Sequence, residues 1–398
     1  MQVSEKSGIR IATFNIRKFS RESVFSTSEK ESTKDLETIG KIIRDEKIDI
    51  LAVQEILHPE ALRSLISTIA QSYAHQIPKL PTAEYINPYI AGKTNQSYGY
   101  RARNWEGRWA VPNSYYGDLE GYAFIWNTNR ISLVETMRNG KKSFFEPRIE
   151  EYIGNRSTDN VVRPPFIGRF MPIGGRYEIR LVNTHIAYTI PSQLRNQNSN
   201  DEVPTPKEVE YRNQEFTTLI SSIYKRFSQE KVDRYTNTTA SKSLEAYTFL
   251  LGDYNLNLSR YPKLVTGSEP FIVNGNNKYD EMRVITINSE LTTLKNRPED
   301  KPENQEKLKM WKENTSDTYH MANNYDHFSF DDKRLESSEK GVGIAMPLST
   351  VVHPFSYYSD QARNSDAEET VYDIYHKRIS DHVPVYIDFD VRKKRMKG

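Results

Sequence analysis

The chain has 398 residues, with 55 Lys and Arg against 53 Asp and Glu, and 36% of its residues are hydrophobic. This balance is typical of a soluble, folded protein that is long enough for one large domain or two smaller ones. There is no Cys, which excludes disulfides, thiolate nucleophiles and metal sites built on thiolates. Any metal must therefore bind oxygen or imidazole.

The two ends of the sequence bear on its location and charge. The opening MQVSEKSGIRIATF lacks the apolar core of a signal peptide, and no apolar stretch reaches the roughly 18 residues of a membrane span. The sequence as given predicts a cytoplasmic protein with no membrane span, or a secreted one if a leader has been removed. The tail 392–398 (RKKRMKG) carries five positive charges, so the rest of the chain is net acidic. This argues against general binding of polyanions, and we expect a solvated terminus.

Short apolar segments rich in Ile, Val, Phe and Tyr predict β-strands along the whole chain. They are 8–15, 49–55, 121–127, 165–170, 176–185, 246–253, 325–330, 348–353 and 383–389. Apolar residues at helical spacing predict helices over 34–47, from Pro59 onward and over 207–230. Several strands follow one another without a helix between them. We therefore expect an α/β (α+β) fold with mixed, mostly antiparallel sheets flanked by helices.

No internal repeat or linker divides the sequence, which predicts one catalytic domain over 1–391 followed by the basic tail. Polar stretches predict long insertions near 78–118, 186–245 and 291–320. The first insertion interleaves aromatic and basic residues, namely Tyr98, Tyr100, Arg101, Arg103, Trp105, Arg108 and Trp109. That pattern fits a nucleic-acid-binding loop, and a loop folded onto its own body is an equally good interpretation.

Five polar motifs lie at the ends of predicted strands. They are Asn15, Gln54-Glu55, Asn183-Thr184-His185, Gly252-Asp253-Tyr254-Asn255 and Ser380-Asp381-His382. Taken one at a time, each has a structural explanation such as a turn or a helix cap. Together they predict that carboxylates, amides and two imidazoles meet at one sheet edge.

That set of side chains favours hydrolysis of a phosphate ester assisted by a metal. Carboxylate and amide oxygens suit Mg²⁺, and Glu55, Asp381 and Asn15 can supply them. The reaction also requires an activated water, stabilisation of charge on the phosphoryl oxygens and protonation of the leaving group. Two histidines and the GDYN motif can perform these tasks.

An ordered set of motifs resembles the endonuclease/exonuclease/phosphatase superfamily, and in particular its deoxyribonuclease I-like branch. The motifs are TFN (13–15), LAVQE (51–55), the strand at 120–126, VNTH (182–185), LLGDYN (250–255), YDHF (325–328) and ISDHVPV (379–385). They span nearly the whole chain. The resemblance implies a four-layered α/β sandwich, in which two packed mixed β-sheets lie between helical layers and the active site lies at one edge of the sheets.

The resemblance also assigns the metal site and the histidines. Glu55, Asn15 and Asp381 match the residues of the metal site, with Glu55 as the principal ligand. His185 and His382 match catalytic imidazoles on either side of the phosphate. Mg²⁺ is the expected cofactor, with Mn²⁺ or Ca²⁺ as alternatives.

The remaining positions match supporting roles in the same family. Asp253 and Asn255 resemble the pair that positions the water and contacts the phosphoryl group. Asp326 matches the carboxylate that orients the histidine of the SDH motif, and Glu120 matches the one that supports the histidine of VNTH. Arg163 matches an arginine that contacts a substrate phosphate.

These expectations combine into a metal-dependent phosphodiesterase. The sequence favours a monomeric nuclease, an endonuclease that cuts DNA with little sequence specificity. One alternative is a phosphoesterase of the same superfamily that acts on a small or lipid substrate, such as an inositol phosphate or sphingomyelin. The second alternative is a binding protein that keeps the fold but has no catalytic activity. It ranks lower because every catalytic residue expected from the resemblance is present in the sequence.

Overall fold

The computed structural model describes most of the chain. The described residues are 8–20, 34–71, 84–86, 97–112, 120–138, 141–150, 161, 163–175, 177–188, 206–230, 245–256, 271–273, 282–286, 290–331, 349–364 and 369–389. The basic tail 392–398 lies outside them, as do parts of the first two predicted insertions.

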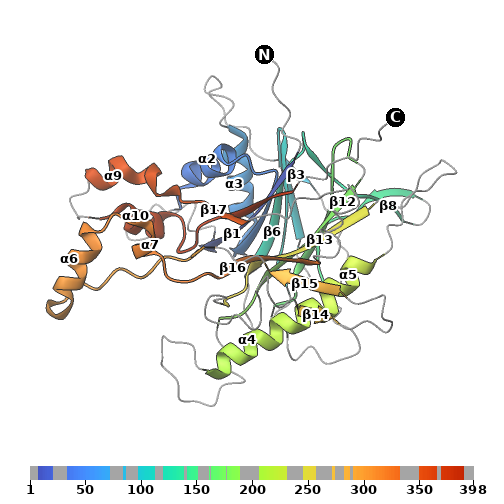
Figure 1. Ribbon diagram of the computed structural model, residues 1–398. Helices are drawn as coiled ribbons and strands as arrows, with labels where there is room; N and C mark the ends of the chain where they lie inside the picture. The colour runs from blue at the N-terminus through green and yellow to red at the C-terminus, as the bar shows by residue number, and fades with distance from the viewer. Residues whose placement is uncertain are drawn as a thin grey trace, which may run out of the picture.

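Two large sheets form the centre of the molecule (Figure 1). The first has the order β17-β18-β1-β2-β6-β5-β4-β3. Its strands are β1 (Ile9–Phe19), β2 (Ile50–Ile56), β3 (Glu84–Ile86), β4 (Ser97–Ala102), β5 (Trp105–Ala110), β6 (Gly121–Asn127), β17 (Ser349–Val351) and β18 (Val385–Phe389). All neighbours are antiparallel except β1 and β2, which run parallel.

The second sheet has the order β10-β11-β12-β13-β16-β15-β14. Its strands are β10 (Arg148–Ile149), β11 (Phe166–Pro172), β12 (Tyr177–His185), β13 (Glu245–Asp253), β14 (Phe271–Val273), β15 (Met282–Thr286) and β16 (Asp326–Asp331). Here β12 and β13 form the parallel pair. The short strand β7 (Ile131–Leu133) pairs with β11, and β8 (Glu135–Arg138) with β9 (Lys141–Phe144) forms a separate hairpin.

Helices cover the outer faces of both sheets (Figure 1). On the first sheet lie α2 (Leu36–Asp45) and α3 (Pro59–Gln71). On the second lie α4 (Pro206–Thr218), a π-helical turn (Leu219–Tyr224) and α5 (Lys225–Gln229). The predicted helices and the sandwich of two mixed sheets between helical layers are therefore confirmed. None of the described helices is both long and apolar enough to span a bilayer.

The inner faces of the sheets pack through aromatic rings and buried polar contacts. Phe124 of β6 stacks on Phe166 of β11, with ring centroids 5.0 Å apart. Between β2 and β12, Gln54 Nε2 donates to Asn183 Oδ1 at 2.6 Å. A buried amide pair of this kind fixes the alignment of two strands, because shifting either one would leave polar groups without partners. The link therefore holds the ends of β2 and β12 side by side.

The first predicted insertion is not a substrate loop in its described part. Residues 97–110 form the β4–β5 hairpin of the first sheet, and Trp105, Arg108 and Trp109 are each less than 5% exposed. Arg108 contacts the carboxylates of Glu106, at 2.8 Å, and Glu146, at 2.6 Å. The nucleic-acid-loop interpretation is wrong for these side chains, because the aromatic residues pack in the core and the arginine is already neutralised. The alternative interpretation, in which this segment folds onto the body of the protein, is correct for these side chains.

The third predicted insertion carries helices that pack beside the carboxyl-terminal part of the chain. It contains a 3₁₀ turn (Pro302–Asn304), α6 (Gln305–Glu313) and α7 (Asp317–His320). Next to them lie a 3₁₀ turn (Pro354–Tyr358), α9 (Ser359–Arg363) and α10 (Val371–Arg378), which together form the lobe on the left of Figure 1. The ring of His320 stacks on Tyr372 of α10 at 3.7 Å. This lobe leads directly into the Ser380-Asp381-His382 loop.

Candidate active site

The sheet topology gathers the polar strand ends at one edge. The parallel pairs β1–β2 and β12–β13 end there, and their antiparallel neighbours begin there. His185 of β12 is in register with Asp253 of β13, which is in register with Asp326 of β16. Gly252 has φ +139°, and a Cβ there would lie 1.9 Å from the carbonyl oxygen of Thr184. Only glycine allows β13 to approach β12 so closely.

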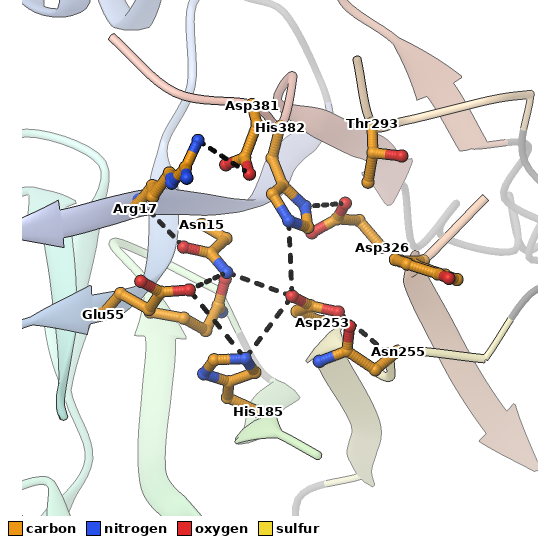
Figure 2. A network of polar contacts seen from close by, with 12 residues as sticks. Asn15, Arg17, Glu55, His185, Asp253, Asn255, Thr293, Asp326, Asp381 and His382 are labelled. Atoms are coloured by element: carbon orange, nitrogen blue, oxygen red, sulfur yellow. Dashed lines mark hydrogen bonds and ion pairs between the residues drawn. The ribbon is translucent and has the colours of Figure 1, made fainter. Parts of the chain in front are cut away.

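The carboxylate of Asp253 lies at the centre of the site (Figure 2). Its Oδ2 accepts a hydrogen bond from Asn15 Nδ2 at 3.0 Å and lies 3.5 Å from both His185 Nε2 and His382 Nε2. Its Oδ1 accepts from the backbone N–H of Asn255 at 2.9 Å. Asp253 is 1% exposed, and this burial raises the pKa of its carboxyl against the opposing effect of the two imidazoles.

His382 is held by a buried carboxylate behind it. Its Nδ1 lies 2.7 Å from Oδ2 of Asp326, which has no exposed surface. Thr292 fixes this strand end, because its hydroxyl accepts from the backbone N–H groups of Tyr325 and Asp326. Burial lowers the pKa of His382, but Asp326 and Asp253 outweigh it and raise that pKa well above 6.5. The two carboxylates therefore favour the protonated form of the ring.

His185 is held in a similar way by Glu120. Its Nδ1 lies 3.0 Å from Glu120 Oε2 and 3.2 Å from Nη1 of Arg163, which also pairs with Glu120 at 3.1 Å. A guanidinium only donates, so Nδ1 cannot serve both neighbours. We assign the Nδ1 proton toward Glu120, because the carboxylate also neutralises Arg163. Burial and Arg163 lower the pKa of His185, and Glu120 with Asp253 raises it, for a net increase.

The same contacts act on the carboxylate of Glu120. Burial raises its pKa, but His185 and Arg163 lower it to about 2. Glu120 is therefore ionised at every pH at which the protein is expected to work, and it can hold the imidazole in one orientation.

Glu55 lies beside this centre and is suited to a hard cation. Its Oε1 accepts from Asn15 Nδ2 at 2.9 Å, its Oε2 accepts from the backbone N–H of Lys18 at 2.9 Å, and Oε1 lies 4.0 Å from His185 Nε2. Within the described ranges, one group of three ligand atoms lies within 4.8 Å of one another, from Glu55, Glu120 and His185. Each oxygen of Glu55 accepts one of these bonds and keeps a lone pair, so the donor set fits a divalent cation.

The other predicted ligands have different surroundings. Asn15 directs its amide nitrogen at Glu55 and Asp253, while its Oδ1 accepts from the backbone N–H of Arg17 at 2.9 Å. Asp381 reaches the site because the neighbouring Ser380 Oγ donates to the carbonyl of Asn15 at 2.7 Å. The Asp381 carboxylate faces Arg17, with Nη1 at 3.2 Å (Figure 2). Both residues therefore border the site, and their binding of a metal stays a prediction.

Arg163 and His327 were considered in the sequence, and Thr292 was not. Arg163 is 6% exposed and faces Glu120, so its contact with a substrate phosphate also stays a prediction. His327 directs Nε2 at the carbonyls of Leu256 and Asn324, away from the site as expected from strand alternation. Thr292 was not predicted, because a threonine far from any motif gives no signal before the chain is folded.

The comparisons with known proteins come from solved structures. No protein-family model and no curated protein matches the sequence. An endonuclease/exonuclease/phosphatase from Bacteroides vulgatus shares 12% identity, with 97% of this chain and 100% of that chain covered and a TM-score of 0.46. A mannosyl-6-phosphatase from Bacteroides thetaiotaomicron shares 12%, with 96% and 99% covered and a TM-score of 0.45.

A third similar structure is that of TDP2 from D. rerio with a single-strand DNA product. It shares 11% identity, with 97% of this chain and 100% of that chain covered and a TM-score of 0.44.

Proposed function

We propose that the protein is a metal-dependent phosphodiesterase, and specifically a nuclease that hydrolyses DNA with little sequence specificity. The observation that carries the proposal is the pair of imidazoles on either side of Asp253, each 3.5 Å from the same oxygen. Behind each ring lies its own carboxylate, Asp326 or Glu120. This arrangement suits a phosphoryl group, whose negative oxygens would bind between two cationic rings.

Each side chain then has a definite task in the reaction. A water attacks phosphorus in line with the leaving oxygen, and Asp253 accepts its proton while Asn255 orients the phosphoryl group. The bond from phosphorus to the leaving oxygen breaks, and His382 gives its proton to that oxygen. His185 remains cationic and donates to a phosphoryl oxygen. These are positioning and proton-transfer roles that the pKa values of the two histidines favour.

A divalent cation would be held by Glu55, with Asn15 and Asp381 as the further predicted ligands. When bound, it would supply Lewis-acid stabilisation of negative charge on the phosphate. A polyanionic substrate is favoured by the rim of the site, where Lys18 is exposed and Arg17 is half-buried next to the catalytic residues. A sugar phosphate or a phospholipid headgroup presents fewer charges to such a rim.

Nicking of a supercoiled plasmid tests the proposal. The wild-type protein is expected to nick with Mg²⁺ and not with chelator, and Glu55→Ala and His382→Ala are expected to lower the rate by 10² or more. His353→Ala is a matched control for the histidine change, because His353 has a one-third exposed side chain and contacts Glu290 and Asp317 rather than the site.

The outcomes separate the alternatives. Metal-dependent nicking that persists in both variants rejects the assigned site. The same preparation is also tested on single-stranded DNA, RNA, a sugar phosphate and sphingomyelin. Turnover of one of the last two without any cutting of nucleic acid rejects the nuclease and supports the small-substrate alternative.

A further inference from the structure

The backbone of Asn255, in the GDYN motif, is strained. Its φ of +50° lies in the left-handed region, which is uncommon for a residue with a side chain, although Asn tolerates it better than most. Conformations of this kind collect at functional sites and persist only where their surroundings hold them. Asn255 is 6% exposed, and the proposed reaction uses its amide on the phosphoryl group. The contacts that hold this backbone therefore also place a catalytic side chain.

Hydrogen bonds link Asn255 to three parts of the chain. Its backbone N–H donates to Asp253 Oδ1 at 2.9 Å, and its Nδ2 donates to the carbonyl of Ile186 at 2.7 Å. Its own carbonyl accepts from Nη1 of Arg212, which lies on helix α4 and is 2% exposed. A guanidinium from the outer helical layer thus reaches the backbone of the turn that carries Asp253 and Asn255.

Helix α4 packs one face against this turn. Arg212 and Phe216 lie four positions apart, so they share that face, and both are buried. The ring centroids of Phe216 and Tyr254 are 5.3 Å apart. Arg212 Nε donates to the carbonyl of Glu208 at 3.3 Å, and the guanidinium lies 4.8 Å from the ring centroid of Tyr188. The helix, although part of the second predicted insertion, therefore supports the turn and directs a fixed guanidinium at its backbone.

His327 of β16 supports the same turn at its end. The ring is buried with no exposed surface, and its centroid lies 5.2 Å from that of Tyr254. His327 Nε2 lies 3.1 Å from the carbonyl oxygen of Leu256 and 3.0 Å from that of Asn324. A carbonyl only accepts, so Nε2 carries the proton and donates to both. His327 thus links the residue after Asn255 to the strand start that leads into Asp326.

We propose that Arg212 and His327 are positioning residues, which together hold Asn255 in its left-handed conformation and so align its amide with the phosphoryl group. The proposal rests on the proposed function and deepens it, because it adds an outer helix and the far face of β16 to the machinery of the same site. Both side chains act through backbone carbonyls. The bond from Arg212 has a charged donor, which makes it one of the stronger kinds of hydrogen bond.

Substitutions that remove each donor test the proposal by kinetics. Arg212→Met and His327→Leu are expected to lower kcat for plasmid nicking by about 10-fold or more, because a small misplacement of an orienting group is costly in the transition state. KM is expected to stay within about twofold, since the amide of Asn255 orients the substrate rather than supplying most of its binding. Arg212→Lys and His327→Gln keep an N–H donor and are expected to recover kcat to within about threefold of the wild type.

A second background separates positioning from a general structural role. Asn255→Gly removes the amide, and glycine adopts a positive φ without strain. If Arg212 acts through the side chain of Asn255, Arg212→Met in the Asn255→Gly background changes kcat by less than about twofold. An equal loss of kcat in both backgrounds overturns the proposal, as does a kcat within threefold of the wild type in either Arg212→Met or His327→Leu.

Arg180→Met is the matched control for the loss of a buried guanidinium. Arg180 lies on β12 with no exposed surface, and it donates to the carbonyl of Glu230 at 2.9 Å in the same helical layer. It also pairs with Glu178, away from the turn. This variant is expected to lose stability in urea unfolding but to keep kcat within about threefold of the wild type.

Hydrogen exchange of the Asn255 amide, measured by NMR in chelator, tests the two proposals separately. Exchange is expected to be about 10-fold faster in Arg212→Met and His327→Leu, and to be near the wild-type rate in Arg212→Lys, His327→Gln and Arg180→Met. Absence of nicking by the wild type together with this exchange pattern rejects the nuclease alone. Nicking together with wild-type exchange in both Arg212→Met and His327→Leu rejects the positioning role alone.

Discussion

Replacement of Asp326 by Asn removes the charge that holds His382 and keeps the shape of the side chain. The N–O distance between the pair is 2.7 Å, and both groups are buried, at 7% and 0% exposure. Unit charges about 4 Å apart attract by about 4 kcal/mol at an effective dielectric constant near 20. Breaking a buried pair by removing one partner costs roughly 3–5 kcal/mol in general. Because the proposed reaction needs His382 protonated and held toward the leaving oxygen, we expect loss of this interaction to raise the activation free energy by about 3–4 kcal/mol and to lower kcat by about 10²–10³.

The pKa of His382 determines how the stability difference between the wild type and Asp326→Asn changes with pH. Asp326 and Asp253 raise the pKa of His382 above its ordinary 6.5, against the effect of burial. The protonated ring therefore stabilises the native state fully below pH 6.5, and this contribution is lost as the pH rises through the raised pKa. The difference in unfolding free energy between the wild type and Asp326→Asn is expected to be largest below pH 6.5 and to shrink at alkaline pH.

The assay combines plasmid nicking with urea unfolding in chelator at several pH values. Asp331→Asn is the matched control, because Asp331 lies at the other end of the same strand and is also buried. It is expected to keep kcat within about threefold of the wild type. If Asp326→Asn loses less than threefold in kcat and its stability difference does not vary with pH, the reasoning about the ion pair is refuted.

Three further changes test other parts of the structure. Glu55→Gln is expected to raise the dissociation constant for Mn²⁺ at least 10-fold, measured by electron paramagnetic resonance, and unchanged binding would contradict its role as a ligand. Thr292→Val removes the acceptor of two backbone N–H groups, the buried one of Asp326 and the partly buried one of Tyr325. We expect kcat to fall about 10-fold at constant KM, with recovery in Thr292→Ser, whereas equal activity of both variants would show that the hydroxyl does not position the strand. His320 donates from Nε2 to the carbonyl of Asn314 at 2.7 Å, and within the described ranges its buried Nδ1 has no partner. Because burial lowers the pKa of this ring, the wild type is expected to lose up to about 1.4 kcal/mol of stability per pH unit below pH 6.5, and urea unfolding of His320→Phe should lack this slope.

Much of the fold could be predicted from local pattern. The strand at 246–253 and the helix at 207–230 follow from apolar spacing, and both are present. The hairpin at 97–110 could not be predicted in this way, because its alternating aromatic and basic residues suit a binding loop as well as a strand. One of the two carboxylates that neutralise Arg108 belongs to Glu146, which lies 38 positions further along the chain, and a local pattern does not reveal that contact.

The sequence by itself predicted which residues meet at one edge of the sheets, since strand ends are the places where a sheet can present carboxylates and imidazoles without breaking its own hydrogen bonds. Only the tertiary structure decided how those residues combine. In the folded protein both histidines lie 3.5 Å from one oxygen of Asp253. The amide nitrogen of Asn15 donates to two carboxylates, and Arg17 forms an ion pair with Asp381. The physical reason is that distances and protonation states depend on strand register and burial across more than two hundred residues, and a sequence pattern contains neither.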